Sequence, residues 1–155
     1  LIAEENIKKV HNRGIGLGDL NETNFVGKNA IITDFDNASI GGLRCDLFPL
    51  YMRYYRNIVK KCDIFESDIF SFFITALSML TDIGIHYEIR EDISSLENLS
   101  FIVSLIPDEY KDLRDYFKLL LDPTTKNEYI TPVLKSLILK PNTKKIEIDK
   151  KYFLR

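Results

Sequence analysis

The sequence predicts a mainly α-helical protein with one small β-hairpin, which places it in the α+β class. Several segments carry apolar residues at spacings of three and four, the period of an amphipathic helix. Two short apolar runs, 24–26 and 30–33, flank a Gly-Lys-Asn turn at 27–29, which is typical of a hairpin. With 155 residues, 45% of them apolar and 28% charged, the chain fits a single globular domain spanning residues 1–155.

Net charge, hydropathy and cysteine content limit the binding partners and the compartment that we expect for this protein. A net charge of −2 gives no basis for expecting nucleic-acid binding. The longest apolar stretch, 69–80, is too short to span a bilayer, so we expect no membrane association. Cys45 and Cys62 are too few for a disulfide framework, and they predict reduced thiols in a cytoplasmic protein.

The N-terminal segment predicts an amphipathic helix. Ala3, Ile7 and Val10 follow one another at spacings of four and three, with charged residues between them. The helix is expected to end near Gly14, which is suited to a C-cap. Because the chain begins at Leu1 without a methionine, inside this helix, we expect it to be a fragment of a longer protein.

Three side chains suited to binding metal or moving protons cluster around the predicted hairpin. Asp19 lies in a loop over 17–24, and Asn24 follows it five residues later. The second strand of the hairpin ends at Asp34, which is followed by Phe35 and Asp36. We therefore expect Asp34 to emerge from a strand end, where a side chain is well positioned.

Beyond this region the chain predicts a long irregular segment and then a buried helix. Residues 37–66 lack clear periodicity, and a long irregular segment in a compact domain is usually functional or disordered. A helix is expected over 67–81, with Ser67 as its cap. Its apolar residues leave no polar face, so we expect it to be buried on all sides as the core helix.

The C-terminal part predicts further helices over 92–140 and a tail over 141–155 that we leave unassigned. A polar segment through Ser100 is expected to be a loop, and the apolar run at 101–106 to end one helix. Pro107 begins another, which ends at Leu121 because proline at 123 disfavours helix before it. A last short helix is expected over 131–139.

The loop and hairpin resemble the catalytic and metal-binding loops of protein kinases. Asp19 and Asn24 match D-x-x-x-x-N, and Asp34 with Phe35 matches the start of D-F-G. Other segments resemble motifs of the kinase large lobe, in the same order. They are His11-Asn12-Arg13-Gly14-Ile15, similar to the end of the helix before the catalytic loop; Asp68-Ile69-Phe70-Ser71-Phe72, similar to D-V-W-S-F-G; and Asp122-Pro123-Thr124-Thr125-Lys126, similar to D-P-x-x-R.

This resemblance implies a protein-kinase-like C-terminal lobe and a role for each site residue. Asp19 would be the catalytic base, and Asn24 and Asp34 would hold Mg²⁺ and bind the nucleotide. Asp68 would be structural and would accept hydrogen bonds from the backbone of the catalytic loop. The implied reaction is transfer of phosphate from ATP to a Ser or Thr hydroxyl of a protein or peptide, with 17–24 as catalytic loop, 34–36 as metal loop and 37–66 as an activation-like segment.

For several of these residues a purely structural role is the alternative interpretation. Asp and Asn favour turns and local backbone hydrogen bonds, so Asp19 and Asn24 could be loop residues only. For Asp36 a structural role is the expectation, since a third acid near the metal is optional. His11 is expected to lie at a helix end or in the core rather than to catalyse.

The sequence also departs from the kinase pattern. H-R-D reads Leu17-Gly18-Asp19, and the lysine two residues after the base is Asn21. D-F-G reads D-F-D, no A-P-E is recognisable, and Lys126 stands where arginine is usual. The Gly18-Asp19 pair and the acidic Asp36 after Asp34-Phe35 are similar to the kinase domains of class III and IV lanthipeptide synthetases and to some small-molecule kinases.

The glycine-rich loop and strand lysine of the kinase small lobe are not found in the sequence. We therefore expect an N-lobe outside this chain as a partner, and no phosphate transfer by this chain alone. Two alternatives stay open. One is a catalytically impaired pseudokinase or interaction module, which the missing cation at Asn21 favours. The other is a small-molecule phosphotransferase, which Gly18 fits.

Overall fold

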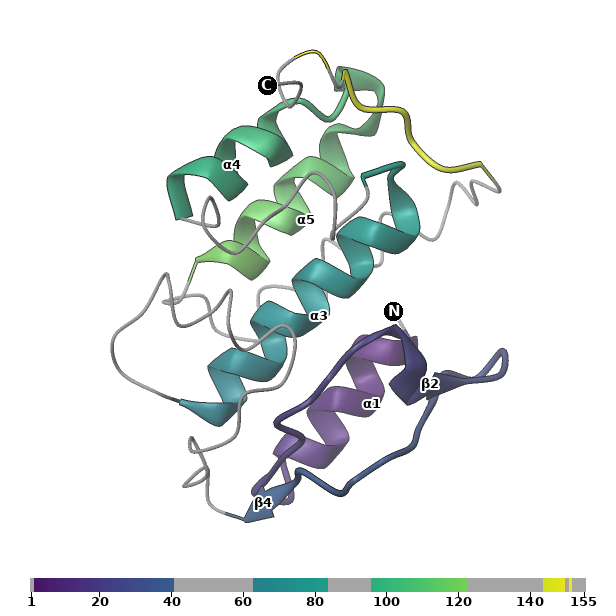
Figure 1. Ribbon diagram of the computed structural model, residues 1–155, viewed down its shortest axis with the longest axis vertical. Coiled ribbons are helices and arrows are strands. Elements are labelled where there is room, and N and C mark those ends of the chain that lie inside the picture. Colours follow the sequence, from purple (N-terminus) through teal and green to yellow (C-terminus); the bar gives the residue numbers. More distant parts are fainter. Residues whose placement is uncertain (1, 41–62, 84–95, 123–143, 150, 152–155) are drawn as a thin grey trace. The chain divides into compact units, whose positions relative to one another are not determined.

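The computed structural model describes residues 2–40, 63–83, 96–122, 144–149 and 151 (Figure 1). These residues are mainly helical with a small amount of antiparallel β-structure, which confirms the predicted α+β class. In chain order the elements are α1 (Ile2–His11), β1 (Ile15–Gly16), the 3₁₀-helix η1 (Glu22–Asn24), β2 (Phe25–Val26), β3 (Ile31–Ile32), β4 (Ser39–Ile40), α3 (Ile64–Leu80), α4 (Leu96–Ser104), the 3₁₀-helix η2 (Asp108–Tyr110) and α5 (Lys111–Leu121). The chain divides into two compact units, residues 1–75 and 76–155, and the division falls within α3.

Helix α1 has the amphipathic character that its spacing predicts. Ile7 is fully buried, and the helix gives way to Gly14 in a left-handed conformation, with a φ of 75°. The N–H of Gly14 donates to the carbonyl of His11 at 2.8 Å, which satisfies one of the last carbonyls of the helix. Glu4 differs from expectation, because it is buried; Lys8, one turn later, pairs with its carboxylate at 2.6 Å.

The predicted hairpin is present as β2 and β3. The strands are antiparallel, with Phe25 opposite Ile32 and Val26 opposite Ile31. The turn is closed by the N–H of Ala30, which donates to the carbonyl of Gly27 at 3.0 Å. A second pair, β1 with β4, was not expected from the sequence and joins the segment before the Asp19 loop to the segment after Asp34.

The core helix begins earlier than predicted, at Ile64 rather than residue 67. The side chain of Asp63 accepts hydrogen bonds from the N–H groups of Phe65 at 2.9 Å and Glu66 at 3.2 Å. Asp63 is therefore the residue that caps α3, and the assignment of Ser67 as the cap is wrong. Ser67 lies buried inside the helix, with its own N–H bonded to the carbonyl of Asp63.

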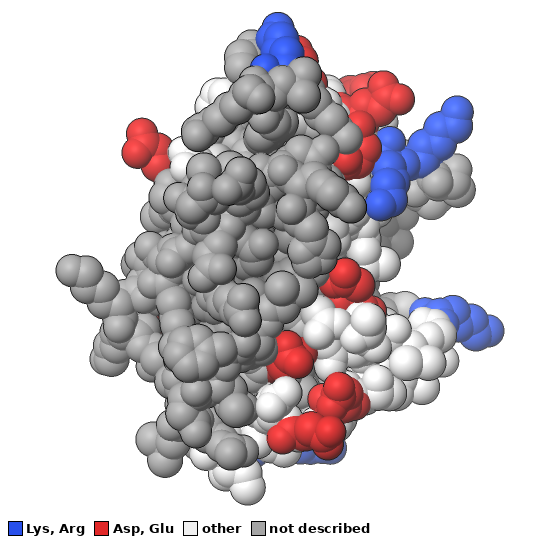
Figure 2. Space-filling view, in the orientation of Figure 1, with Lys and Arg blue, Asp and Glu red and all other residues white. Residues whose placement is uncertain are grey.

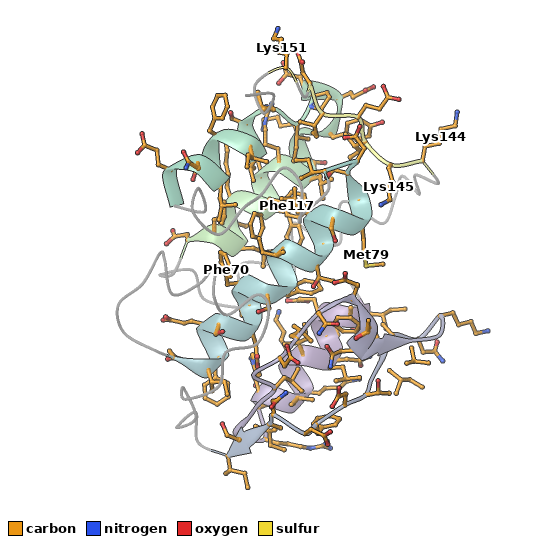
Figure 3. All side chains as sticks on the ribbon, in the orientation of Figure 1. Phe70, Met79, Phe117, Lys144, Lys145 and Lys151 are labelled. Atoms are coloured by element: carbon orange, nitrogen blue, oxygen red, sulfur yellow. The ribbon has the colours of Figure 1, made fainter. Side chains whose placement is uncertain are left out.

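The prediction that α3 is buried on all sides holds for most of its length and fails at its end. The apolar side chains from Phe70 to Leu77 are buried, whereas Met79 is 58% exposed and Leu80 is 43% exposed (Figure 3). Thr75, a buried polar residue of this helix, satisfies its hydroxyl locally by donating to the carbonyl of Ser71 at 2.8 Å.

In the second unit α4 packs against α5 (Figure 1). Their buried apolar side chains include Leu99, Ile102 and Val103 from α4 and Leu113, Phe117 and Leu120 from α5. Helix α4 begins at Leu96, so the expectation of a loop through Ser100 is wrong. Helix α5 ends at Leu121, as the following Asp-Pro pair predicts.

Residues 144–149 lie beside the end of α3 and the two residues that follow it. Ile146 forms a parallel bridge with Thr81 and accepts a hydrogen bond from the N–H of Asp82 at 2.9 Å. The side chain of Asp82 in turn accepts from the N–H of Ile148 at 2.9 Å. Ile146 and Ile148 are buried, so this part of the unassigned tail completes the core of the second unit.

Several sequence-based expectations lie outside the described residues. They are most of the activation-like segment (41–62), the helix over 131–139 and the Asp-Pro-containing match beyond residue 122. Within the described residues, acidic and basic side chains both reach the face shown in Figure 2. No helix among them has the length and apolar character needed to cross a membrane.

Candidate functional site

A buried carboxylate on α3 holds the loop that carries Asp19. Asp68 is 1% exposed, and its two oxygens accept hydrogen bonds from the N–H of Leu17 at 2.7 Å and the N–H of Gly18 at 2.9 Å. The hydrogen bonds expected of Asp68 are thus confirmed. Because the acceptor is charged, these bonds are stronger than those between neutral groups, and they fix the start of the loop against α3.

His11, at the end of α1, is a third partner of the same carboxylate. Its Nε2 lies 2.8 Å from Oδ2 of Asp68, and its ring packs edge-on against Phe65 with ring centres 4.9 Å apart. His11 is therefore a helix-end residue that joins α1, the loop and α3, as the sequence suggested for it. Its contact with Asp68 was not foreseen.

Gly18 occupies the position of the arginine in the H-R-D pattern, and its conformation favours glycine there. Its φ is 79°, and a Cβ placed on it would lie 2.7 Å from the carbonyl oxygen of Asn37. An arginine at this position would have to adopt a strained backbone and displace the neighbouring chain. Gly16 is constrained by packing alone, because a Cβ there would collide with the side chain of Ile64.

The loop then closes into the 3₁₀-helix η1 through two asparagines. The side-chain oxygen of Asn21 accepts from the N–H of Thr23 at 2.9 Å, and that of Asn24 accepts from the N–H of Asn21 at 2.8 Å. This reciprocal pair is a capping box. Asn21, at the position of the kinase lysine, is thus engaged in holding the loop together.

Asn24 also connects the loop to the end of β3. It is 2% exposed, and its Nδ2 donates to the carbonyl of Thr33 at 3.0 Å and lies 3.5 Å from the carbonyl of Asp34. The sequence places Asn24 in the first strand; the structure places it in η1, because its side chain caps that turn. An amide oxygen has two lone pairs, so the Asn24 oxygen keeps one after accepting from Asn21.

Asp34 follows β3 in a backbone conformation that few residues other than glycine adopt. Its φ is 66°, and its side chain is exposed. Asp tolerates the left-handed region better than most residues, yet the conformation still costs free energy and is found preferentially at functional sites. The neighbouring N–H of Asp36 lies 3.4 Å from one carboxylate oxygen.

Asp19 is partly buried, and its carboxylate interacts electrostatically with that of Asp34. Burial, and then the negative charge of Asp34, raise the pKa of Asp19, while the amides of Asn21 and Asn37 act in the opposite direction. The Nδ2 of Asn37 donates to Oδ2 of Asp19 at 3.4 Å. The structure therefore brings Asp19, Asn24 and Asp34 into one site, with Asp68 behind the loop.

The donors of this site suit a magnesium ion that arrives with phosphates. Among the described residues, no group of three or more His, Cys, Asp and Glu side chains could hold a metal by itself. Mg²⁺ is commonly held by one or two carboxylates together with the phosphates of its substrate. The exposed carboxylate of Asp34 and the remaining lone pair of the Asn24 oxygen fit that mode of binding.

Two features of the site escaped the sequence: the donor Asn37 and the pairing of β1 with β4 that places it. Strands of two residues carry no detectable period, so no pattern could have indicated them. The chain matches no model of a known protein family and no curated protein. Its function is therefore inferred from the geometry of these side chains.

Proposed function

We propose that this chain is the large lobe of a protein-kinase-like phosphotransferase, which transfers phosphate from ATP to Ser or Thr hydroxyls of a protein or peptide. The observation that carries the proposal is the loop of Asp19, held at its start by the buried carboxylate of Asp68. The loop ends at Asn24, which bonds to the strand end carrying Asp34. A base, an amide and a second carboxylate in this arrangement fit phosphoryl transfer, which depends on positioning and charge.

Asp19 would accept the proton of the attacking hydroxyl. Its partial burial and the nearby charge of Asp34 raise its pKa, which makes the carboxylate a better proton acceptor than an exposed aspartate. The loop hydrogen bonds of Asn21 and Asn24 restrict where this carboxylate can lie, as a positioned base requires.

Asn24 and Asp34 would hold magnesium. The ion would bridge phosphate oxygens and neutralise the charge that develops on them. The repulsion between the carboxylates of Asp19 and Asp34 supports a cation near this pair, because a positive charge there would relieve it.

The second candidate is a non-catalytic scaffold with the same fold. Asn21 favours it, because its side chain caps the loop and supplies no cation at the position of the kinase lysine. A protein of this kind would keep the Asp68 hydrogen bonds, which serve the fold, without transferring phosphate.

Nucleotide binding with and without magnesium tests the proposal. In the whole protein, including any N-lobe, Asp34→Asn is expected to weaken magnesium-dependent ATP binding about tenfold or more, since even residues behind the metal ligands contribute that much. Asp36→Asn, a change of the same type two residues away, serves as the matched control and should bind as wild type. Titration calorimetry measures both.

Phosphate transfer to protein acceptors distinguishes the two candidates. Magnesium-dependent transfer that Asp19→Asn abolishes supports the enzyme. Nucleotide binding without transfer supports the scaffold. Full magnesium-dependent affinity in Asp34→Asn would show that the metal assignment is wrong.

A further inference from the structure

We propose that Asn37 is a positioning residue for the Asp19 carboxylate, which it holds by a side-chain hydrogen bond from the turn that follows Asp34. The inference rests on the proposed function, in which Asp19 is the catalytic base. The kinase pattern supplies a lysine near this carboxylate, and Asn21, which stands at that position, carries no charge. The structure points to Asn37 as the group that takes over part of that role without a charge.

The backbone of Asn37 is placed by the pairing of β1 with β4. Ile15 lies opposite Ile40 and Gly16 opposite Ser39. Continuing this antiparallel register by two residues brings Gly18 opposite Asn37. The contact is close, since a Cβ on Gly18 would lie 2.7 Å from the carbonyl oxygen of Asn37.

A turn after Asp34 fixes Asn37 from the other direction. The N–H of Ala38 donates to the carbonyl of Phe35 at 3.0 Å, so Asn37 lies inside a closed turn. The side chain is partly buried. Both the strand pairing and the turn therefore aim the residue at the Asp19 loop.

From this position the amide of Asn37 reaches one carboxylate oxygen. Its Nδ2 donates to Oδ2 of Asp19 at 3.4 Å, a long bond that a small shift of either side chain would tighten. A carboxylate has two oxygens, so Oδ1 remains available to accept the proton of a substrate hydroxyl. Holding one oxygen fixes the direction in which the other points.

Asn21 acts on the same carboxyl group, because its amide, like that of Asn37, lowers the pKa of Asp19. Its Nδ2 donates to the backbone carbonyl of Asp19 at 3.3 Å, and its Oδ1 accepts from Thr23. Asn37 reaches the carboxylate oxygen Oδ2 from a different segment of the chain, the turn that follows Asp34. The charged side chain acting on Asp19 there is Asp34, which opposes ionisation.

The test measures the Asp19 carboxyl directly, by NMR titration of its side-chain carbon in the whole protein. Asn37→Leu keeps the volume and removes the donor, so the pKa of Asp19 is expected to rise above its wild-type value. Asn37→Asp adds a negative charge and is expected to raise it further. Asn29→Leu, in the exposed hairpin turn, is the matched control and should leave it unchanged.

Activity supplies the second measurement. Asn37→Leu is expected to lower kcat about tenfold, the scale of one hydrogen bond to a charged group, with little change in KM for ATP. The acid limb of the pH profile should move to higher pH, because the base must be ionised to act.

The two measurements separate the inference from the function on which it rests. An unchanged pKa of Asp19 in Asn37→Leu overturns the inference, whether or not the protein transfers phosphate. A raised pKa in a protein that transfers no phosphate retains the contact and rejects the enzyme. If Asn37→Leu does not fold, Asn37→Ala removes the same donor. Unfolding of both variants would overturn the inference, because Asn37 would then be needed for the fold itself.

Discussion

Replacing Asp68 by alanine should destabilise the protein strongly. The change removes a buried acceptor and leaves the N–H groups of Leu17 and Gly18 without partners. A buried donor left unsatisfied costs about 1–3 kcal/mol, so the two together cost about 2–6 kcal/mol. For a chain of this size each kcal/mol lowers Tm by about 2–4 °C, so Tm should fall by about 4–24 °C.

Asp19→Ala is the matched control for this experiment. It removes a carboxylate that is only partly buried and that repels Asp34, so Tm should change little. Asp68→Asn keeps one carbonyl oxygen as an acceptor and should lie between the two. Thermal and urea unfolding followed by circular dichroism measure the differences. Equal Tm values for Asp68→Ala and Asp19→Ala would refute the structural role of Asp68.

Two further predictions concern the same loop. Because the folded state raises the pKa of Asp19, the contribution of this group to stability is present below its unfolded pKa and is lost as pH rises through its folded pKa. The stability of Asp19→Asn relative to wild type should therefore increase from acid to neutral pH. Urea midpoints of both proteins, measured at acid and at neutral pH, test this. A difference in urea midpoint between Asp19→Asn and wild type that stays constant over this pH range would contradict the raised pKa that we attribute to burial and to Asp34. Gly18→Ala should cost more than Gly14→Ala, because both residues have a positive φ but only at Gly18 would the new Cβ meet a backbone atom, the Asn37 oxygen. The strain common to both is about 1–2 kcal/mol and the collision adds about 1–3 kcal/mol, so equal unfolding free energies would show that the loop can move aside.

The parts of the fold that the sequence predicts are those governed by local rules. The spacing of Ile7 and its neighbours indicates α1, Gly14 marks its end, and the turn at 27–29 marks the hairpin. The contact between Asp68 and the Asp19 loop is different, since no local pattern connects residues so far apart. It was predicted only because several sequence motifs resemble those of the kinase large lobe and occur in the same order.

The parts that escaped prediction depend on competition between residues or on tertiary contacts. Asp63 and Ser67 can each cap a helix, and α3 begins at the earlier one because Ile64, between them, is fully buried. Because Glu4 is charged, its sequence predicts an exposed side chain, whereas tertiary packing buries it. The position of Asn37 near Asp19 depends on the pairing of β1 with β4, and strands of two residues show no detectable pattern in the sequence.

The hydrogen bonds of Asp68 also have a consequence for how the protein can vary in evolution. They join residues that are 50 and 51 positions apart in the chain. The entropy of closing a loop grows only with the logarithm of its length, so doubling that length would cost about 0.6 kcal/mol. Insertions and deletions between β4 and α3 should therefore accumulate among homologues more readily than changes to Asp68 itself, and the position of the Asp19 loop should persist through them.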